Sequence, residues 1–152
     1  MSSEITKCSA DSDKLKESPC LFLNNNLDEL VLLNQWLETD ISQLFEKSDK
    51  ILFKIDLVLT ELLSNIVNYG YLDKTKSEIF IRCCVFQDAI QFEIEDYGIE
   101  FNPLSAPEHI FPQTLEQAKV GGLGLHLVRN YVDKCSYVRE QKKNIFTIVF
   151  FR

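Results

Sequence analysis

The sequence lacks any long apolar run. Its apolar stretches are only a few residues long, whereas a membrane-spanning helix needs about 20 consecutive apolar residues. The first twenty residues carry several charged side chains and lack the apolar core of a secretory signal peptide. Positive charge is also scarce, because 16 Lys and Arg stand against 23 Asp and Glu, a net charge of −7. We therefore expect no membrane contact, and no direct nucleic-acid binding, since nucleic-acid binders usually show the opposite balance.

Paired cysteines are lacking too. The five cysteines are odd in number and form no CxxC pair, which argues against a zinc site and against a secreted disulfide scaffold. The adjacent Cys83 and Cys84 fit a strand in which they point to opposite faces. We expect reduced thiols in a cytoplasmic protein.

A chain of 152 residues with 45% hydrophobic and 26% charged residues is long enough for one globular domain. Residues 1–18 are rich in Ser, Asp, Lys and Glu and are predicted to form a disordered tail. Residues 19–152 are predicted to form a single domain.

Hydrophobic periodicity divides this domain into helices and strands. Leu27 to Phe45 has apolar residues at helical spacing, with Asn26 as the N-cap and Glu29 placed for a capping box. A second helix runs from about Asp49 through Asn68 and stops at Gly70. The predicted strands are Cys20–Asn24, Glu78–Phe86, Ala89–Glu95, Ser136–Glu140 and Asn144–Phe151, and a last helix runs from Gly124 to about Val132.

This order of elements is not the strict strand–helix alternation of a doubly wound fold. It predicts an α+β, two-layer sandwich, with helices packed on one face of a mixed, largely antiparallel sheet. Between Asp96 and Gly121 the periodicity disappears, and Pro103, Pro107 and Pro112 break any long element. A loop this long inside a compact domain is usually functional.

The second helix carries a row of polar side chains beside its apolar stripe. At 100° per residue, Glu61, Asn65 and Asn68 fall within about 60° of one another. A carboxylate can orient or deprotonate a hydroxyl, and an amide oxygen is a suitable Mg²⁺ ligand. Taken alone, the row also suits an ordinary solvated helix face.

Two further motifs suit a nucleotide. Asp96, at the end of a strand, is placed to accept a hydrogen bond from an exocyclic amine, and Gly98 allows a ring to approach the backbone. The alternative is an ordinary strand-ending turn. The run Gly121-Gly-Leu-Gly124 opens a helix whose free N–H groups favour phosphate, although a glycine-rich joint without a ligand would look the same.

The order and spacing of these motifs resemble the N, G1 and G2 boxes of the Bergerat ATP fold in the GHKL ATPase superfamily. Within it, the runs Glu61-Leu-Leu-Ser-Asn65-Ile-Val-Asn-Tyr-Gly70 and Gly121-Gly-Leu-Gly-Leu-His-Leu-Val128 are similar to the anti-sigma-factor serine/threonine kinases of the RsbW and SpoIIAB type. The resemblance covers about residues 20–152.

The resemblance implies ATP and Mg²⁺ as cofactors and assigns a role to each matching residue. Asn65 would coordinate Mg²⁺, Asn68 would belong to the nucleotide site, and Glu61 would orient or deprotonate the serine hydroxyl of a protein substrate. Asp96 would bind the adenine amine, with Gly98 near the ring. The phosphates would be held by Gly122, Leu123, Gly124 and Leu125, under an ATP lid at Leu104–Val120 in which Lys119 would touch the γ-phosphate.

One position departs from the superfamily pattern. Glu100 stands where the second glycine of Asp-x-Gly-x-Gly-Phe is usual, and it adds negative charge near a phosphate site. We therefore expect this charge to weaken the affinity for nucleotide.

The resemblance implies an ATP-dependent protein serine kinase that is also an anti-sigma factor in a partner-switching system. It would bind a sigma factor, phosphorylate a STAS-type anti-sigma-factor antagonist, and form a homodimer. The alternative is a non-catalytic module of the same fold, in which bound nucleotide gates the affinity for a protein partner.

Overall fold

The computed structural model describes residues 18–45, 49–73, 75–105 and 122–152. The predicted tail, apart from its last residue, lies outside the described residues, and so do most of the predicted lid and Lys119. Within the described part of the chain, no helix is both long and apolar enough to cross a membrane.

The described strands form one sheet in the order β1-β2-β3-β5-β4. Each pair of neighbours is antiparallel, so the sheet predicted as mixed and largely antiparallel is antiparallel throughout these pairings. The strands are β1 (Cys20–Asn24), β2 (Glu78–Val85), β3 (Ala89–Asp96), β4 (Lys134–Glu140) and β5 (Lys143–Phe151).

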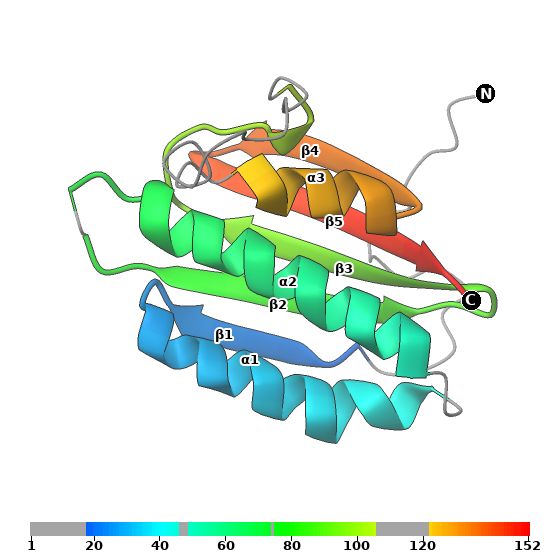
Figure 1. Cartoon of the computed structure of the whole chain (residues 1–152). Helices are drawn as coiled ribbons and strands as arrows, with labels where there is room; N and C mark the ends of the chain where they lie inside the picture. The colour runs from blue at the N-terminus through cyan, green and yellow to red at the C-terminus, as the bar shows by residue number, and fades with distance from the viewer. Residues whose placement is uncertain (1–17, 46–48, 74, 106–121) are drawn as a thin grey trace.

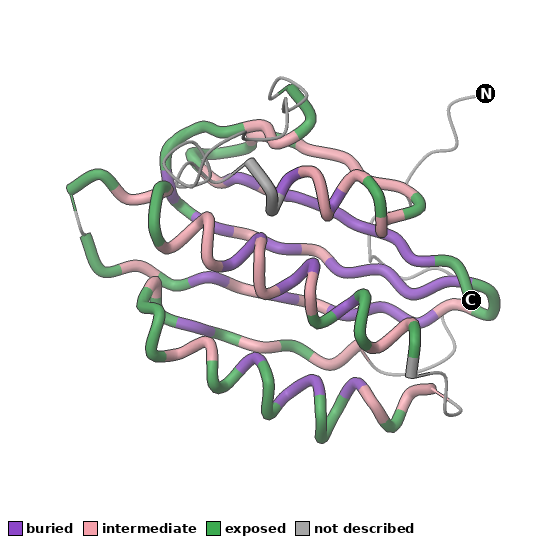
Figure 2. The backbone as a smooth tube through the Cα atoms, viewed as in Figure 1, coloured by how far each residue is buried: buried purple, intermediate pink, exposed green. Residues whose placement is uncertain are grey.

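Three α-helices in the described residues, α1 (Leu30–Trp36), α2 (Asp49–Tyr69) and α3 (Gly122–Tyr131), lie side by side on one face of this sheet (Figure 1). The predicted α+β two-layer architecture is confirmed. Buried residues gather where the helical layer meets the sheet (Figure 2). Fully buried side chains from both layers include Leu33, Ile55, Leu59, Leu63, Ile81, Phe92 and Ile148.

The first helical segment is less regular than predicted. A 3₁₀ turn (Leu27–Glu29) precedes α1, and a π-helical turn (Leu37–Ile41) and a second 3₁₀ turn (Ser42–Leu44) follow it. Asn26 caps the segment as predicted, because its side chain accepts the amide of Asp28 at 3.0 Å. The predicted capping box is wrong: the Glu29 carboxylate accepts the backbone amide and the side-chain amide of Asn24, at 2.5 and 2.6 Å. Glu29 therefore ties the helix to the end of β1.

The turn between β4 and β5 sets the register of the site. Gln141 and Lys142 have positive φ angles of 49° and 64°, so the hairpin closes with two residues and β5 begins at Lys143, one residue earlier than predicted. Positive φ at both central residues is typical of a type I′ turn, whose twist matches that of the strands. The resulting register places Arg139 opposite Asn144, and Asn144 opposite Asp96.

The cysteines differ in state. Cys20, Cys83 and Cys135 are free thiols, whereas Cys84 is disulfide-bonded, so the expectation of reduced thiols throughout is wrong for Cys84. Burial raises the pKa of the Cys83 thiol, which makes this side chain a packing residue of the core rather than a reactive group.

Candidate functional site

The polar row of α2 faces α3. The two helices pack against each other and run in opposite directions (Figure 1), and the Lys54 ammonium lies 6.0 Å from the centre of the Tyr131 ring. Lys54, Glu61 and Asn68 are spaced by seven residues, nearly two full turns, and therefore share one face of α2. Glu61 and Asn65 are half-buried, whereas Asn68 is exposed.

The helix rise brings the glycine-rich start of α3 near this row. Going from Lys54 to Asn65 advances about 16 Å along α2, and going from Tyr131 back to Gly122 covers about 14 Å along α3. Because the helices are antiparallel, these lengths predict that Gly122 lies roughly level with Asn65. Helix geometry therefore predicts that a carboxylate, an amide and a helix N-terminus lie near one another between the two helices.

The helix α3 begins at Gly122, two residues before the predicted start at Gly124. The first N–H groups of an α-helix have no partner within the helix, and the positive end of its dipole lies beside them. The backbone amides of Gly122, Leu123 and Gly124 are in this first turn, whereas that of Leu125 falls where intrahelical bonding starts. The geometry therefore favours the first three over Leu125 as phosphate donors. The Leu125 side chain is buried.

Asp96 is a buried carboxylate at the end of β3, with 6% of its surface exposed. Its Oδ1 accepts the Gly98 amide at 2.8 Å and the Asn144 side-chain amide at 3.0 Å. Among the described residues, no hydrogen bond ends on Oδ2, which leaves this oxygen for a ligand donor. Burial raises the pKa of Asp96 above its usual value. The hydrogen bonds from Asn144 and Gly98 and the charge of Arg139 act in the opposite direction and lower this pKa, but burial has the larger effect.

Asn144 and its neighbours were missed by the sequence analysis. The Asn144 side-chain amide donates to Asp96 and to the Ile99 carbonyl at 2.8 Å. Its oxygen accepts the Tyr137 hydroxyl at 2.6 Å and Nη1 of Arg139 at 2.9 Å. These residues come from β4 and β5, more than 35 positions along the chain from Asp96, and no local motif marks them.

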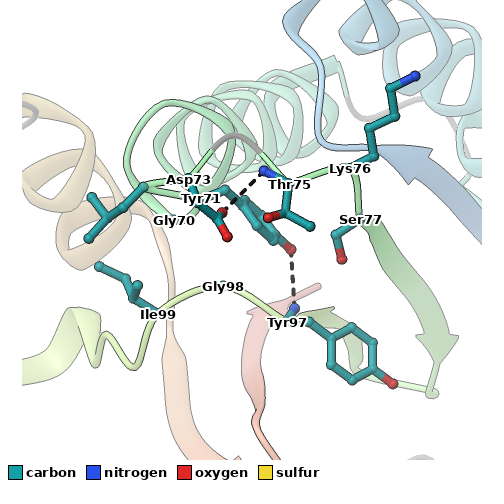
Figure 3. A pocket seen from close by; sticks show the side chains of 10 residues that line it. Gly70, Tyr71, Asp73, Thr75, Lys76, Ser77, Tyr97, Gly98 and Ile99 are labelled. Atoms are coloured by element: carbon teal, nitrogen blue, oxygen red, sulfur yellow. Dashed lines mark hydrogen bonds between the residues drawn. The ribbon is translucent and has the colours of Figure 1, made fainter.

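The two residues that follow α2, Gly70 and Tyr71, hold the Asp96–Ile99 turn from its other side. The Ile99 amide donates to the Gly70 carbonyl at 2.8 Å, and the Tyr97 amide donates to the Tyr71 hydroxyl at 3.1 Å (Figure 3). A Cβ on Gly98 would lie 2.7 Å from the Gly70 oxygen, so this position requires glycine for lack of space rather than for an unusual φ angle.

A shallow hollow of about 500 Å³ adjoins this turn on the side of the loop that follows α2 (Figure 3). Of the predicted site residues, it includes only Gly98. The hollow is lined by residues 70–73, 75–77 and 97–99.

Glu100, the departure from the superfamily pattern, is exposed. Positive φ angles in non-glycine residues of the described chain occur at Gln141 and Lys142, so Glu100 has an ordinary backbone conformation. A glutamate can therefore occupy this position, where the superfamily pattern has glycine, without backbone strain.

The donor set fits Mg²⁺ bound to nucleotide better than a metal held by protein alone. The described residues contain no cluster of three or more His, Cys, Asp or Glu that could hold a metal ion. Mg²⁺ in nucleotide sites typically takes one or two protein oxygens and completes its shell with phosphate and water. A single amide oxygen on Asn65, near a helix N-terminus, suits that arrangement.

Two kinds of comparison with known proteins bear on this site. The sequence profile described as histidine kinase-like ATPase domain matches residues 23–150. The chain is 29% identical over 84 residues to the serine-protein kinase RsbW of Bacillus velezensis, an alignment that covers 53% of this chain and 52% of that protein. The chain thus spans about half of the length of that kinase.

Two other relatives align over more of their length. The serine/threonine-protein kinase BtrW of Bordetella bronchiseptica is 27% identical over 122 residues, which cover 80% of this chain and 78% of that protein. The anti-sigma F factor of Oceanobacillus iheyensis is 22% identical over 103 residues, which cover 68% of this chain and 70% of that protein.

Proposed function

Because the chain belongs to the histidine kinase-like ATPase domain family, we propose that it binds ATP with Mg²⁺ and transfers the γ-phosphoryl group to a serine of a protein partner. The main observation in support of nucleotide binding is the buried carboxylate of Asp96. Its Oδ1 accepts two hydrogen bonds, whereas its Oδ2 accepts no hydrogen bond from the described residues. A purine amine is a chemically matched donor for that oxygen.

The phosphate end of the nucleotide would lie between α2 and α3. The amides of Gly122, Leu123 and Gly124 would donate to phosphate oxygens, and Asn65 would bind Mg²⁺, which neutralises charge on the phosphates. Asn68 would belong to the same row, and Lys119 would add a positive charge from the lid. Positioning and charge neutralisation are the main requirements of phosphoryl transfer.

Glu61 is the proposed catalytic residue. It lies one helical turn before Asn65 on the face of α2 that looks toward α3, so its carboxylate would orient the serine hydroxyl and accept its proton. The relatives named serine-protein kinase and serine/threonine-protein kinase support the proposed kinase activity. We further propose that the chain is a partner-switching kinase that binds a sigma factor and phosphorylates a STAS-type antagonist. The relative named anti-sigma F factor supports the sigma-binding part of this proposal. Residues 19–152 would act as one cytoplasmic domain that forms homodimers.

Calorimetry of ATP binding in the presence of Mg²⁺ tests the site. We expect binding in the wild type, loss of binding in Asp96→Asn, and loss of the Mg²⁺ dependence in Asn65→Ala. Asn130→Ala is a matched control, because Asn130 is an exposed amide on α3 whose side chain, among the described residues, donates to the His126 carbonyl of its own helix. The absence of ATP binding in the wild type would contradict the proposal.

Phosphate transfer to a protein substrate tests the kinase part. We expect Glu61→Gln to abolish transfer to the serine while it retains ATP binding. If the wild type binds ATP but transfers no phosphate to any STAS-type substrate, the non-catalytic, nucleotide-gated module is the better description.

A further inference from the structure

Arg139 reaches the candidate site from the edge of the sheet. It lies on β4 opposite Asn144 of β5, which in turn lies opposite Asp96 of β3, so the three residues form one row across three strands. Nη1 of Arg139 donates to the Gly98 carbonyl at 2.9 Å and to Oδ1 of Asn144 at 2.9 Å. Arg139 thus contacts both the turn that follows Asp96 and the amide that holds Asp96.

The contact with Asn144 fixes which way that side chain points. Oδ1 of Asn144 faces two donors, the Tyr137 hydroxyl and Arg139, so the oxygen must lie on this side. The NH₂ group is then directed at Asp96 Oδ1 and at the Ile99 carbonyl. Without the guanidinium, one of the two donors that define this orientation is lost.

The contact with Gly98 holds the turn against the strands. The segment that follows α2 binds the neighbouring amides of Tyr97 and Ile99, and Arg139 binds the carbonyl of Gly98 between them. Because Gly98 also donates its amide to Asp96 Oδ1, a shift of this peptide would move the carboxylate.

We propose that Arg139 is a positioning residue for base recognition: acting through Asn144 and the Gly98 carbonyl, it directs Oδ2 of Asp96 at the exocyclic amine of the purine and so sets selectivity for an amine-bearing base. This inference rests on the proposed function, since it assumes that a nucleotide binds beside Asp96. The hydrogen bonds of Arg139 to other described residues end on Gly98 and Asn144, so its contribution should concern the base rather than the phosphates.

The test compares two ligands that differ only in the amine. The dissociation constants of ATP and of purine riboside triphosphate, which lacks the 6-amino group, are measured with Mg²⁺ for the wild type and for Arg139→Met. Methionine keeps an unbranched side chain but removes the donors and the charge. In Arg139→Met we expect the affinity for ATP to fall about tenfold, because the variant loses charge-assisted hydrogen bonds that position Asp96. The affinity for the analogue should stay within about twofold of the wild-type value.

Two variants control the measurement. Arg139→Lys keeps a charged donor and should restore part of the preference for ATP. Arg82→Met removes an arginine that stacks on Phe80 of β2, away from the turn, and should leave both affinities unchanged.

The possible failures are distinguishable. If the wild type does not prefer ATP over the analogue, the assignment of Asp96 in the proposed function is wrong. If the wild type prefers ATP and Arg139→Met keeps the same preference, or loses affinity for both ligands equally, the role of Arg139 in base selection is overturned while the proposed function stands.

Discussion

Asn144 and Asp96 face each other across the pairing of β3 with β5, and the Asn144 amide donates to Oδ1 of Asp96 over 3.0 Å. Each of the two residues has 6% of its surface exposed. A buried carboxylate without partners is strongly destabilising, so this contact serves the fold as well as the site. The same hydrogen bond leaves Oδ2 for a ligand.

Replacing Asn144 by alanine should therefore affect stability and binding together. The change removes four hydrogen bonds and leaves the Asp96 carboxylate and the Tyr137 hydroxyl each short of a partner. We expect the free energy of unfolding in urea to fall by about 1–3 kcal/mol, with weaker ATP binding by calorimetry. An unchanged urea midpoint would show that water replaces the amide at no cost.

Replacing Gly98 by alanine should be destabilising for steric reasons. The added Cβ would lie 2.7 Å from the Gly70 carbonyl oxygen and 2.8 Å from Oδ1 of Asp96, and the first of these is backbone at the end of α2. We expect a loss of about 1–3 kcal/mol in urea unfolding and a loss of ATP binding, because the turn must separate from α2. Tyr97→Ala is the control. Because the Tyr97 side chain is exposed, the free energy of unfolding of this variant should differ from that of the wild type by less than about 0.5 kcal/mol.

The elements and the position of Asp96 could be predicted because their signals are local. Alternation along β3, the glycine after α2 and the glycines that open α3 are each readable within a few residues. The arginine and asparagine that support Asp96 could not be predicted, since they approach it only through the pairing of three strands. That pairing depends on a Gln-Lys turn with positive φ, which lacks the usual Asn-Gly signal.

The first helical segment was predicted as one regular helix because its apolar spacing is helical throughout. Periodicity does not distinguish α-helical turns from π or 3₁₀ turns, since each keeps a similar face buried. The same limit applies to Glu29. Its spacing from Asn26 fits a capping box, but Asn24 at the end of β1 offers two donors at close range, and the carboxylate binds those instead.

The pKa of Asp96 predicts a pH dependence of stability. Burial raises this pKa above its value in the unfolded chain, so the contribution of Asp96 is fully present below the unfolded pKa and is lost as pH rises through the folded one. Asp96→Asn does not titrate. We expect its free energy of unfolding, relative to that of the wild type, to increase as pH rises from about 4 toward neutrality.

Urea unfolding of both proteins across this pH range checks the sign. Burial also raises the pKa of Glu93, but this residue is common to both proteins and its contribution cancels in the difference. A difference that stays constant with pH would show that Asp96 titrates alike in the folded and unfolded states. ATP binding to the wild type should change in the opposite direction and weaken as pH falls, because the protonated carboxyl loses its preference for an amine donor.

Trp36 provides a prediction for the core. Its ring packs edge-on against Phe92, with centroids 6.3 Å apart, and its buried Nε1 has no hydrogen-bond partner among the described residues. Trp36→Phe should cost less than about 1 kcal/mol, because removing an unsatisfied N–H offsets part of the lost volume, whereas Trp36→Ala should cost about 3–5 kcal/mol. Since Trp36 is the one tryptophan of the chain, unfolding must be followed by circular dichroism rather than by fluorescence. Equal losses in the two variants would contradict the prediction, because they would mean that a phenyl ring recovers none of the packing of the indole.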